Sequence, residues 1–247
     1  MTSTAIDVPS TRWRRRKDAR PGEIVAAGLA CFAERGFAAT RLDDVARRAG
    51  VTKGTLYLYF PNKEELFKAV VRQAVVPNIA FGEALVDRSA EPASVLLQQL
   101  IDRLSTAMMA PASAIPKIVI AEAGNFPDIA RFYLEEVIQR GLAVFRRLLE
   151  RGVARGEFHP MDVESTAYCI VAPMVLGMMW RHSFARHEER PFDAGALCRA
   201  HLQLLSRGLL ASDEGRRGKE DLPKADRTTG ARPRRKLRTT GAPARAA

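Results

Sequence analysis

Five residues near the amino end carry side chains suited to contact with a polyanion. They are Thr52, Lys53, Thr55, Tyr57 and Tyr59, and they lie within eight positions of one another. Hydroxyl and ammonium groups donate hydrogen bonds to phosphate oxygens, and lysine and threonine also reach base edges in the DNA major groove. In a helix with Val51 and Leu56 directed to the core, these residues are left for an outward face. The segment therefore predicts nucleic-acid binding.

Two of these residues also have a purely structural interpretation. Lys53 could be a solvated lysine at a helix start, and Tyr57 could belong partly to the core, because it follows an apolar residue. A cation is not favoured at the positive end of a helix dipole, so a lysine in that place favours a functional role. We therefore expect both residues to contact DNA.

Positioning these side chains requires a helix, a tight turn and a second helix. The pattern predicts helices over 41–49 and 52–59, with Gly50 supplying the positive φ of the turn between them. Ala46 is small enough to let the two helices cross closely. Thr40 is placed to cap the first helix, three residues before an acid that would complete a capping box. This is the organisation of a helix-turn-helix.

Many spaced positions make this region similar to the N-terminal domain of TetR-family regulators, over about residues 22–70. A single Ala–Gly–Val turn would be weak evidence, whereas agreement at many positions together is specific. The rest of the chain matches the family only in length and helical layout. The resemblance is carried by Phe32-Ala33-Glu34-Arg35-Gly36-Phe37, Thr40, Val45-Ala46, Ala49-Gly50-Val51, Lys53-Gly54-Thr55-Leu56-Tyr57, Tyr59-Phe60 and Lys63-Glu64-Glu65-Leu66.

The resemblance implies that helix 52–59 enters the major groove of double-stranded DNA at its N-terminal end. Lys53 and Thr55 are the expected base-edge contacts, and Gly54 lets the backbone approach the DNA. The expected phosphate contacts are Thr40, Thr52, Tyr57, Tyr59 and Lys63.

The formal charge of +11 is concentrated at the two ends of the chain. Residues 1–20 hold six Lys/Arg against two acids and residues 212–247 hold eleven against five, which leaves about +1 for residues 21–211. Both ends lack apolar periodicity, so we expect a disordered basic arm and a disordered basic tail. The arm could lie in a minor groove or be a solvated tether, and either would strengthen salt-dependent affinity. The nearly neutral body means that charge alone does not establish DNA binding.

Apolar residues recur three or four positions apart through residues 21–211, which predicts an all-α protein of about nine helices. A helix-turn-helix DNA-binding domain would occupy residues 21–70, and a helical ligand-binding and dimerisation domain residues 71–211. Pro173 should kink its helix or remove one hydrogen bond. The expected helices are 22–35, 41–49, 52–59, 63–80, 92–109, 114–123, 128–155, 162–186 and 193–211.

The resemblance also implies that the larger domain encloses a cavity for a small apolar or amphipathic effector. The expected lining is Leu104, Met108, Ile118, Glu122, Asn125, Phe126, Phe145 and Met178. Glu122 and Asn125 in this lining need hydrogen-bond partners if they are buried, and a ligand, a helix cap or Arg131 could supply them. The last two helices resemble the pair that joins family members into homodimers. The expected interface is Leu176, Met179, Leu197, His201, Leu204 and Leu205.

These features together predict a cytoplasmic, ligand-responsive repressor that binds a palindromic operator as a homodimer. The alternative within the same fold is an architectural, nucleoid-associated DNA-binding protein. An enzyme is disfavoured because the sequence has no nucleophile motif, phosphate loop or metal-ligand spacing, so we expect no catalytic residue, metal or cofactor. Three dispersed cysteines form no disulfide framework, and no signal peptide or membrane span is recognised.

Overall fold

The computed structural model describes residues 11–190 and 192–211. All regular structure in this part of the chain is helical, apart from one isolated bridge between Phe158 and Leu210. The predicted all-α class is therefore confirmed. The basic tail expected over 212–247 lies outside the described residues.

The described residues contain the helices of a smaller and a larger bundle. The first four are α1 (Thr11–Ala39), α2 (Leu42–Arg48), α3 (Lys53–Tyr59) and α4 (Lys63–Ala74). The others are α5 (Val76–Arg88), α6 (Ala93–Met109), α7 (Ile115–Glu122), α8 (Pro127–Tyr133), α9 (Arg140–Ala154), α10 (Val163–Ser183) and α11 (Ala194–Leu209). Short segments are η1 (Pro111–Ala114), η2 (Leu134–Gln139) and η3 (Ala185–His187). Because only Val75 separates α4 from α5, and η2 joins α8 to α9, this part of the chain has the nine continuous helices predicted.

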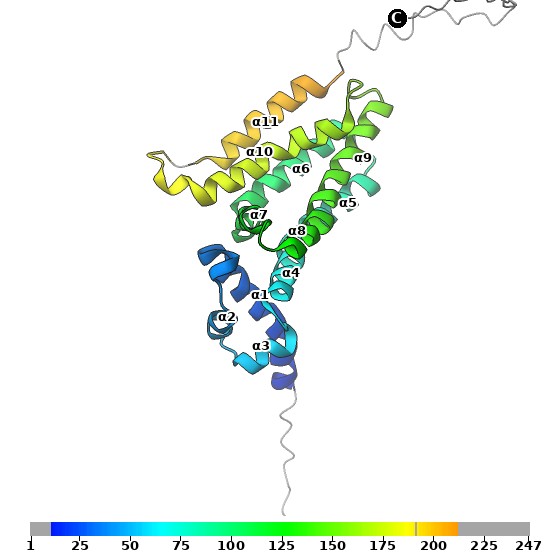
Figure 1. The fold of residues 1–247 in the computed structure, drawn as a ribbon. Helices are drawn as coiled ribbons and strands as arrows, with labels where there is room; N and C mark the ends of the chain where they lie inside the picture. Colours follow the sequence, from blue (N-terminus) through cyan, green and yellow to red (C-terminus); the bar gives the residue numbers. More distant parts are fainter. Residues whose placement is uncertain (1–10, 191, 212–247) are drawn as a thin grey trace, which may run out of the picture. The chain divides into compact units, whose positions relative to one another are not determined.

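Helices α1 to α4 share the first core (Figure 1), in which α1 packs against both α2 and α4. Phe32, Phe37 and Phe67 are almost completely buried, and their ring centroids lie 5.3–5.6 Å apart. Burying one such side chain contributes about 1.5–3 kcal/mol. The three rings therefore fix α1 against α4, and Leu56 brings α3 into the same core.

Helix α1 differs at its start from the helix expected over 22–35. It begins at Thr11, so residues 11–20 are helical, in contrast to the disordered arm expected over 1–20, of which 1–10 lie outside the described residues. Arginine, lysine and alanine favour helix and need no apolar face when they extend a helix that is already packed. Gly36 breaks the regular helix with a φ of 80°, close to the expected end.

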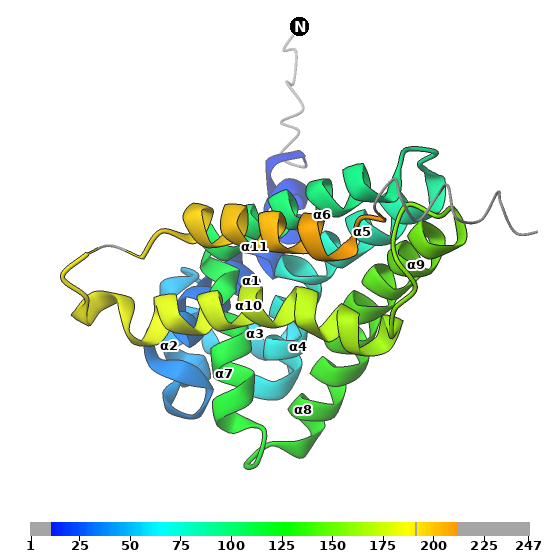
Figure 2. The same ribbon diagram turned by 90° about the horizontal axis from the view of Figure 1, so that it is seen from above.

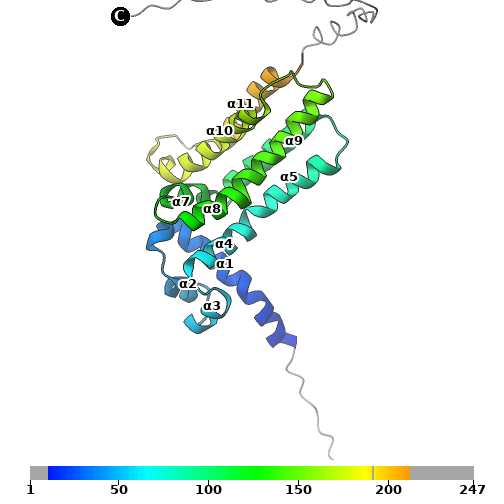
Figure 3. The same ribbon diagram turned by 45° about the vertical axis from the view of Figure 1, so that its right-hand side comes forward.

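Helices α5, α6, α9, α10 and α11 enclose a second core, whereas the buried residues of α7 and α8 belong to the first core. Figure 3 shows α5, α9 and α10 running side by side, and Figure 2 shows α11 alongside α10. Leu96, Leu148 and Ile170 are fully buried between them. This bundle is the helical domain that the sequence predicts after the helix-turn-helix.

A glycine and a proline lie inside continuous helices of this bundle. The helix expected to end at residue 80 continues as α5 to Arg88 and includes Gly82, which is buried. A Cβ at Gly82 would lie 3.1 Å from Val144 Cγ1, so the glycine allows α5 to approach α9. Helix α10 likewise runs from Val163 to Ser183 with Pro173 inside it.

Close packing at Gly152 of α9 gives a test of the second core. A Cβ there would lie 2.2 Å from Phe158 Cδ2. We expect Gly152→Ala to lower the free energy of unfolding by about 1–3 kcal/mol, because overpacking forces the ring or the backbone to move. Chemical denaturation would measure the change. The matched control is Gly141→Ala in the same helix, where a Cβ meets no heavy atom within 4 Å; equal stability of the two variants would contradict this packing.

Candidate nucleic-acid interface

The turn between α2 and α3 has the geometry predicted from the sequence. Gly50 has a φ of 66°, and Val51 N donates a hydrogen bond of 3.0 Å to Ala46 O. Ala46 is buried where the two helices meet. The positive φ at Gly50 reverses the chain within a few residues, which a β-branched residue there would resist.

Helix α3 is capped by the side chain of Thr52. Its Oγ1 accepts a hydrogen bond of 3.1 Å from Thr55 N and lies 2.9 Å from Thr55 Oγ1. An N-cap of this kind contributes about 1 kcal/mol to helix stability. Both hydroxyls expected to contact DNA therefore also organise the start of α3.

One side of α3 faces the core and the other faces outward. Leu56 is fully buried, whereas Lys53, Gly54 and Tyr57 are exposed. Leu58 is 83% exposed, which is unusual for a large apolar side chain. Leu58 is absent from the predicted contacts because those rest on polar side chains; the signal in the sequence is an apolar residue on the polar face of a helix.

Lys53 has an acidic partner on the preceding helix. Its Nζ lies 2.9 Å from Asp43 Oδ1, and 5.9 Å from the centroid of the Tyr57 ring. The hydrogen bond to Asp43 raises the pKa of Lys53. Since the two charged side chains are 62% and 45% exposed, solvent screens the pair and an anionic ligand can compete for the ammonium group.

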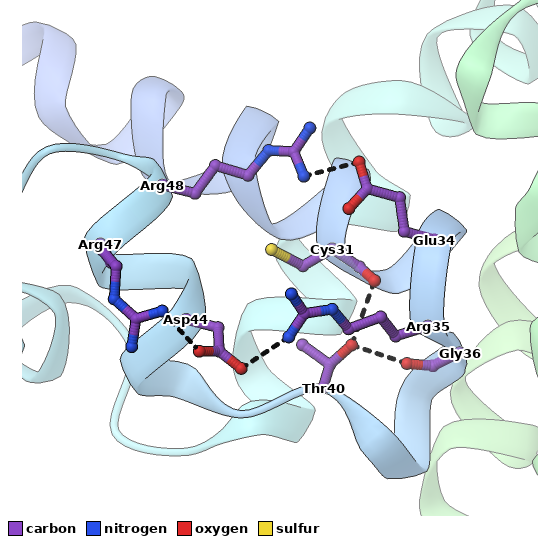
Figure 4. A network of polar contacts seen from close by, with 8 residues as sticks. All are labelled: Cys31, Glu34, Arg35, Gly36, Thr40, Asp44, Arg47 and Arg48. Atoms are coloured by element: carbon purple, nitrogen blue, oxygen red, sulfur yellow. Dashed lines mark hydrogen bonds and ion pairs between the residues drawn. The ribbon is translucent and has the colours of Figure 1, made fainter.

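Thr40 does not lie on the outward surface, so its expected phosphate contact is wrong for this structure. The residue is only 2% exposed, and its hydroxyl donates toward Gly36 O at 2.7 Å and Cys31 O at 3.2 Å (Figure 4). Its expected role as helix cap is also wrong, because Arg41 occupies the N-cap of α2 and forms no side-chain cap. The Thr40 hydroxyl thus fixes the segment between α1 and α2 to backbone carbonyls of α1.

Ion pairs around Thr40 hold α1 and α2 together. Asp44 pairs with Arg35 at 2.8 Å and with Arg47 at 3.1 Å, and Arg48 pairs with Glu34 at 2.6 Å (Figure 4). Such exposed pairs contribute at most about 1 kcal/mol each. Their main effect is to occupy these three arginines, just as Asp43 occupies Lys53, the one cation of α3.

Lys63, another expected phosphate contact, is turned toward α1. Its Nζ donates a hydrogen bond of 3.0 Å to Ala38 O and lies 4.5 Å from the centroid of the Phe37 ring. Asn62 caps α4 by accepting a hydrogen bond of 2.8 Å from Glu65 N. The structure thus places Lys63 in the contact between α1 and α4.

A cavity of about 470 Å³ opens between α5, α6, α9 and α10. Three of the expected lining residues, Leu104, Phe145 and Met178, contribute to it. The full lining is Val75, Asn78, Ile79, Gly82, Leu100, Arg103, Leu104, Ala107, Val137, Ile138, Gly141, Leu142, Val144, Phe145, Tyr168, Val171, Ala172, Val175, Leu176, Met178 and Met179. Apolar side chains dominate this surface, as in most small-molecule sites.

The other five expected lining residues lie elsewhere. Met108 and Ile118 are buried in the cores, and Asn125 and Phe126 line a separate surface hollow. Glu122 Oε1 accepts a hydrogen bond of 3.1 Å from Ala38 N. Glu122 is therefore satisfied by the end of α1, not by the cavity.

Phe126 completes the contact between the two bundles. Its ring packs edge-on against Phe37, with centroids 4.8 Å apart. Asn125 Nδ2 lies 3.4 Å from Glu122 Oε2. Glu122 and Asn125, predicted to line the ligand cavity, thus belong to the junction between the DNA-binding and larger domains, which local periodicity does not reveal.

The expected dimer stripe is only partly exposed. His201 is buried and donates from Nε2 to Ile170 O at 3.0 Å, and Leu197 and Leu205 are half-buried against the second core. Leu176 and Met179 line the cavity, and Leu176 is also exposed, as is Leu204. The expected residues therefore divide between core, cavity and surface.

A different apolar stripe lies along α10. Tyr168, Leu176 and Trp180 of α10 and Phe184, its C-cap, are exposed and spaced four or eight residues apart, so the stripe winds gradually around the helix. By length and composition alone, α10 and the continuous segment Lys63–Arg88 are apolar enough to cross a membrane. α10 nevertheless packs against α6, α7, α9 and α11, so its exposed face is the part that needs a partner.

Comparisons with known proteins point to one family. The family model described as bacterial regulatory proteins, tetR family, matches residues 24–70, and that of the tetracyclin repressor-like C-terminal domain matches residues 96–195. The HTH-type transcriptional repressor KstR2 of Mycobacterium tuberculosis (strain ATCC 25618 / H37Rv) is 32% identical over 155 residues, covering 60% of this chain and 74% of that protein.

Solved structures show the same fold. Ketosteroid transcriptional regulator KstR2 of Mycobacterium tuberculosis has a TM-score of 0.62 at 26% identity, covering 85% of this chain and 100% of that chain. FadR from Bacillus subtilis, in complex with stearoyl-CoA, has a TM-score of 0.60 at 21% identity, covering 76% and 98%. The latter likeness concerns the fold alone.

The buried position of Thr40 predicts a structural role. We expect Thr40→Val to lower the free energy of unfolding by about 1 kcal/mol, because the hydroxyl hydrogen bonds to two carbonyls are lost. Thr106→Val is the matched control, since the exposed hydroxyl of Thr106 bonds only its own helix at Asp102 O. Denaturation curves would measure both, and unchanged stability of Thr40→Val would contradict the assignment.

Proposed function

Because the chain belongs to the TetR family of bacterial regulatory proteins, we propose that it represses transcription by binding a palindromic operator as a homodimer and releasing it when an effector enters the cavity. It is a DNA-binding transcriptional regulator, and the family is not an enzyme family. The proposed location is the cytoplasm, because a bacterial transcriptional regulator acts where the chromosome lies. The observation that carries the proposal is the outward face of α3, where Lys53 and Tyr57 are exposed beside a capped helix start.

The base-reading surface consists of residues that α3 presents outward. Lys53 and Thr55 lie in the first turn, where a recognition helix meets base edges, and Gly54 adds no side chain to hold the backbone away. Thr52 and Tyr57 flank them for phosphate contact, with Tyr59 at the half-buried edge. Binding replaces the Asp43 carboxylate by DNA as the partner of Lys53.

Leu58 adds an apolar contact to this surface. An exposed leucine in water gains nothing for folding, whereas a thymine methyl group in the major groove offers it an apolar partner. Its exposure of 83% leaves the side chain free for such a contact. We therefore include Leu58 among the specificity residues.

The α10 stripe supplies the dimer contact. One seven-residue recognition helix reads few bases, so a two-fold dimer with helices about 34–36 Å apart doubles the site. Tyr168, Leu176, Trp180 and Phe184, together with Leu204 on α11, give a self-complementary apolar face. A second copy of the chain covers this face, and no membrane contact is required.

In this proposal the effector binds in the cavity, and the contacts between the two bundles transmit the resulting shift to the DNA-binding domain. Helices α5, α6, α9 and α10 line the cavity, and α7, which packs against α10, holds α1 through Glu122. A ligand that fits only one arrangement of these helices changes the position of α1, and with it that of α3. Since coupling is reciprocal, the operator also weakens the binding of such a ligand.

The α3 assignment is tested with Lys53→Ala and Asp43→Asn. An operator is first selected from random duplexes, and fluorescence anisotropy then gives the dissociation constants. We expect Lys53→Ala to weaken binding about tenfold per half-site through loss of a base-edge contact. Asp43→Asn should strengthen binding a few-fold, because Lys53 no longer leaves an ion pair.

Size-exclusion chromatography and circular dichroism would verify that both variants are folded dimers. Unchanged affinity of the Lys53→Ala variant would refute the recognition-helix assignment. Weaker binding by Asp43→Asn would show that Asp43 positions Lys53 for DNA and does not compete with it.

The cavity assignment is tested by filling it. Gly141 lines the cavity and a Cβ there meets no heavy atom within 4 Å, so a larger side chain has space. We expect Gly141→Leu to bind the operator like the wild type and to need at least about tenfold more effector for release, as the lost volume excludes ligand. Gly141→Ala is the matched control. Equal release by all three proteins would place the effector elsewhere.

A further inference from the structure

The cavity has an almost entirely apolar wall with one charged residue. Of its 21 lining residues, only Asn78, Arg103 and Tyr168 have polar side chains. An apolar wall binds the body of a ligand, and a few placed polar groups orient it. Arg103 therefore decides which polar group a ligand should carry.

Neutral groups hold Arg103 in place. Its Nε donates a hydrogen bond of 2.9 Å to Asn78 Oδ1, and its Cζ lies 5.0 Å from the centroid of the Phe81 ring. Asn78 and Phe81 are three residues apart on α5, so they form one support for a side chain from α6. An amide oxygen and an aromatic face orient a guanidinium group but do not neutralise it.

Neighbouring arginines of the same bundle are paired with acids. Arg140 pairs with Glu83 at 2.9 Å, and Arg147 with Asp87 at 2.7 Å. The hydrogen bond from Arg140 lowers the pKa of Glu83, which keeps that carboxylate charged and occupied. Among the residues whose contacts the structure describes, no carboxylate pairs with Arg103.

The geometry suits a carboxylate in particular. With Nε engaged by Asn78, the two terminal nitrogens of Arg103 remain for a planar anion, and guanidinium and carboxylate form parallel hydrogen bonds. The apolar lining beside it suits an aliphatic or alicyclic body. We propose that the ligand of this cavity is an amphipathic carboxylate whose anionic group binds Arg103. This inference rests on the effector cavity proposed above and specifies its ligand class.

Three probes of one chain length test the charge preference: dodecanoate, dodecan-1-ol and dodecyltrimethylammonium. Titration calorimetry at low ionic strength, below micelle formation, gives their dissociation constants for the full chain. We expect the wild type to bind dodecanoate about tenfold more tightly than the alcohol, as a hydrogen-bonded charge pair should allow. Arg103→Gln should remove this difference, and Arg103→Glu should reverse it in favour of the ammonium probe.

Arg88→Gln is the matched control, because Arg88 is an exposed arginine on α5 that does not line the cavity. It should keep the wild-type preference, and all variants should keep operator affinity. Equal binding of dodecanoate and dodecan-1-ol by the wild type would overturn the inference, as would the absence of binding by all three probes.

Neither of those results would overturn operator repression by itself. The proposed function fails separately, if the wild-type chain selects no operator or if Gly141→Leu leaves release by a bound probe unchanged. Retention of the carboxylate preference by Arg103→Gln would show that another group holds the anion and would also overturn the role of Arg103.

Discussion

A helix of seven residues is not stable by itself in water, so α3 depends on the core beneath it. Leu56 anchors it from below, and Thr52 satisfies a backbone donor at its start. Everything that α3 presents to DNA is therefore positioned by α1, α2 and α4. The Phe32, Phe37 and Phe67 rings that hold these helices together consequently determine the geometry of recognition, although none of them reaches the outward surface.

The same ring cluster links recognition to the larger domain. Phe37 packs against Phe67 on one side and Phe126 on the other, and the backbone of Ala38 is bonded by both Lys63 and Glu122. The last turn of α1 is thus held jointly by α4 and by the α7–α8 region. Packed rings do not deform continuously, so a shift of α7 moves this turn as a unit or leaves it in place. That property is what a two-state regulator requires.

Sequence periodicity predicted the elements but not the long-range partners. Nine helices, the Gly50 turn and the outward position of Lys53 follow from local rules, and all are found in the described residues. Thr40 was misassigned because the rules for a helix cap and for a buried hydroxyl select the same residue type. Glu122 was misassigned because its partner, Ala38, is 84 positions away. A local pattern identifies a polar residue that needs a partner, but only the packing identifies that partner.

The two cations proposed to bind DNA and effector, Lys53 and Arg103, differ in how they are supported. The body of the chain has a net charge of about +1, so its attraction for anions is local. Lys53 rests on a carboxylate, so contact with DNA first breaks that ion pair; the cost is the same at every site, and specificity comes from the base contacts. Arg103 rests on an amide and a ring, and gives up no charge partner when an anion arrives. The first arrangement weakens every contact of Lys53 with phosphate by the cost of its ion pair, whereas the second leaves the charge of Arg103 without a carboxylate to displace.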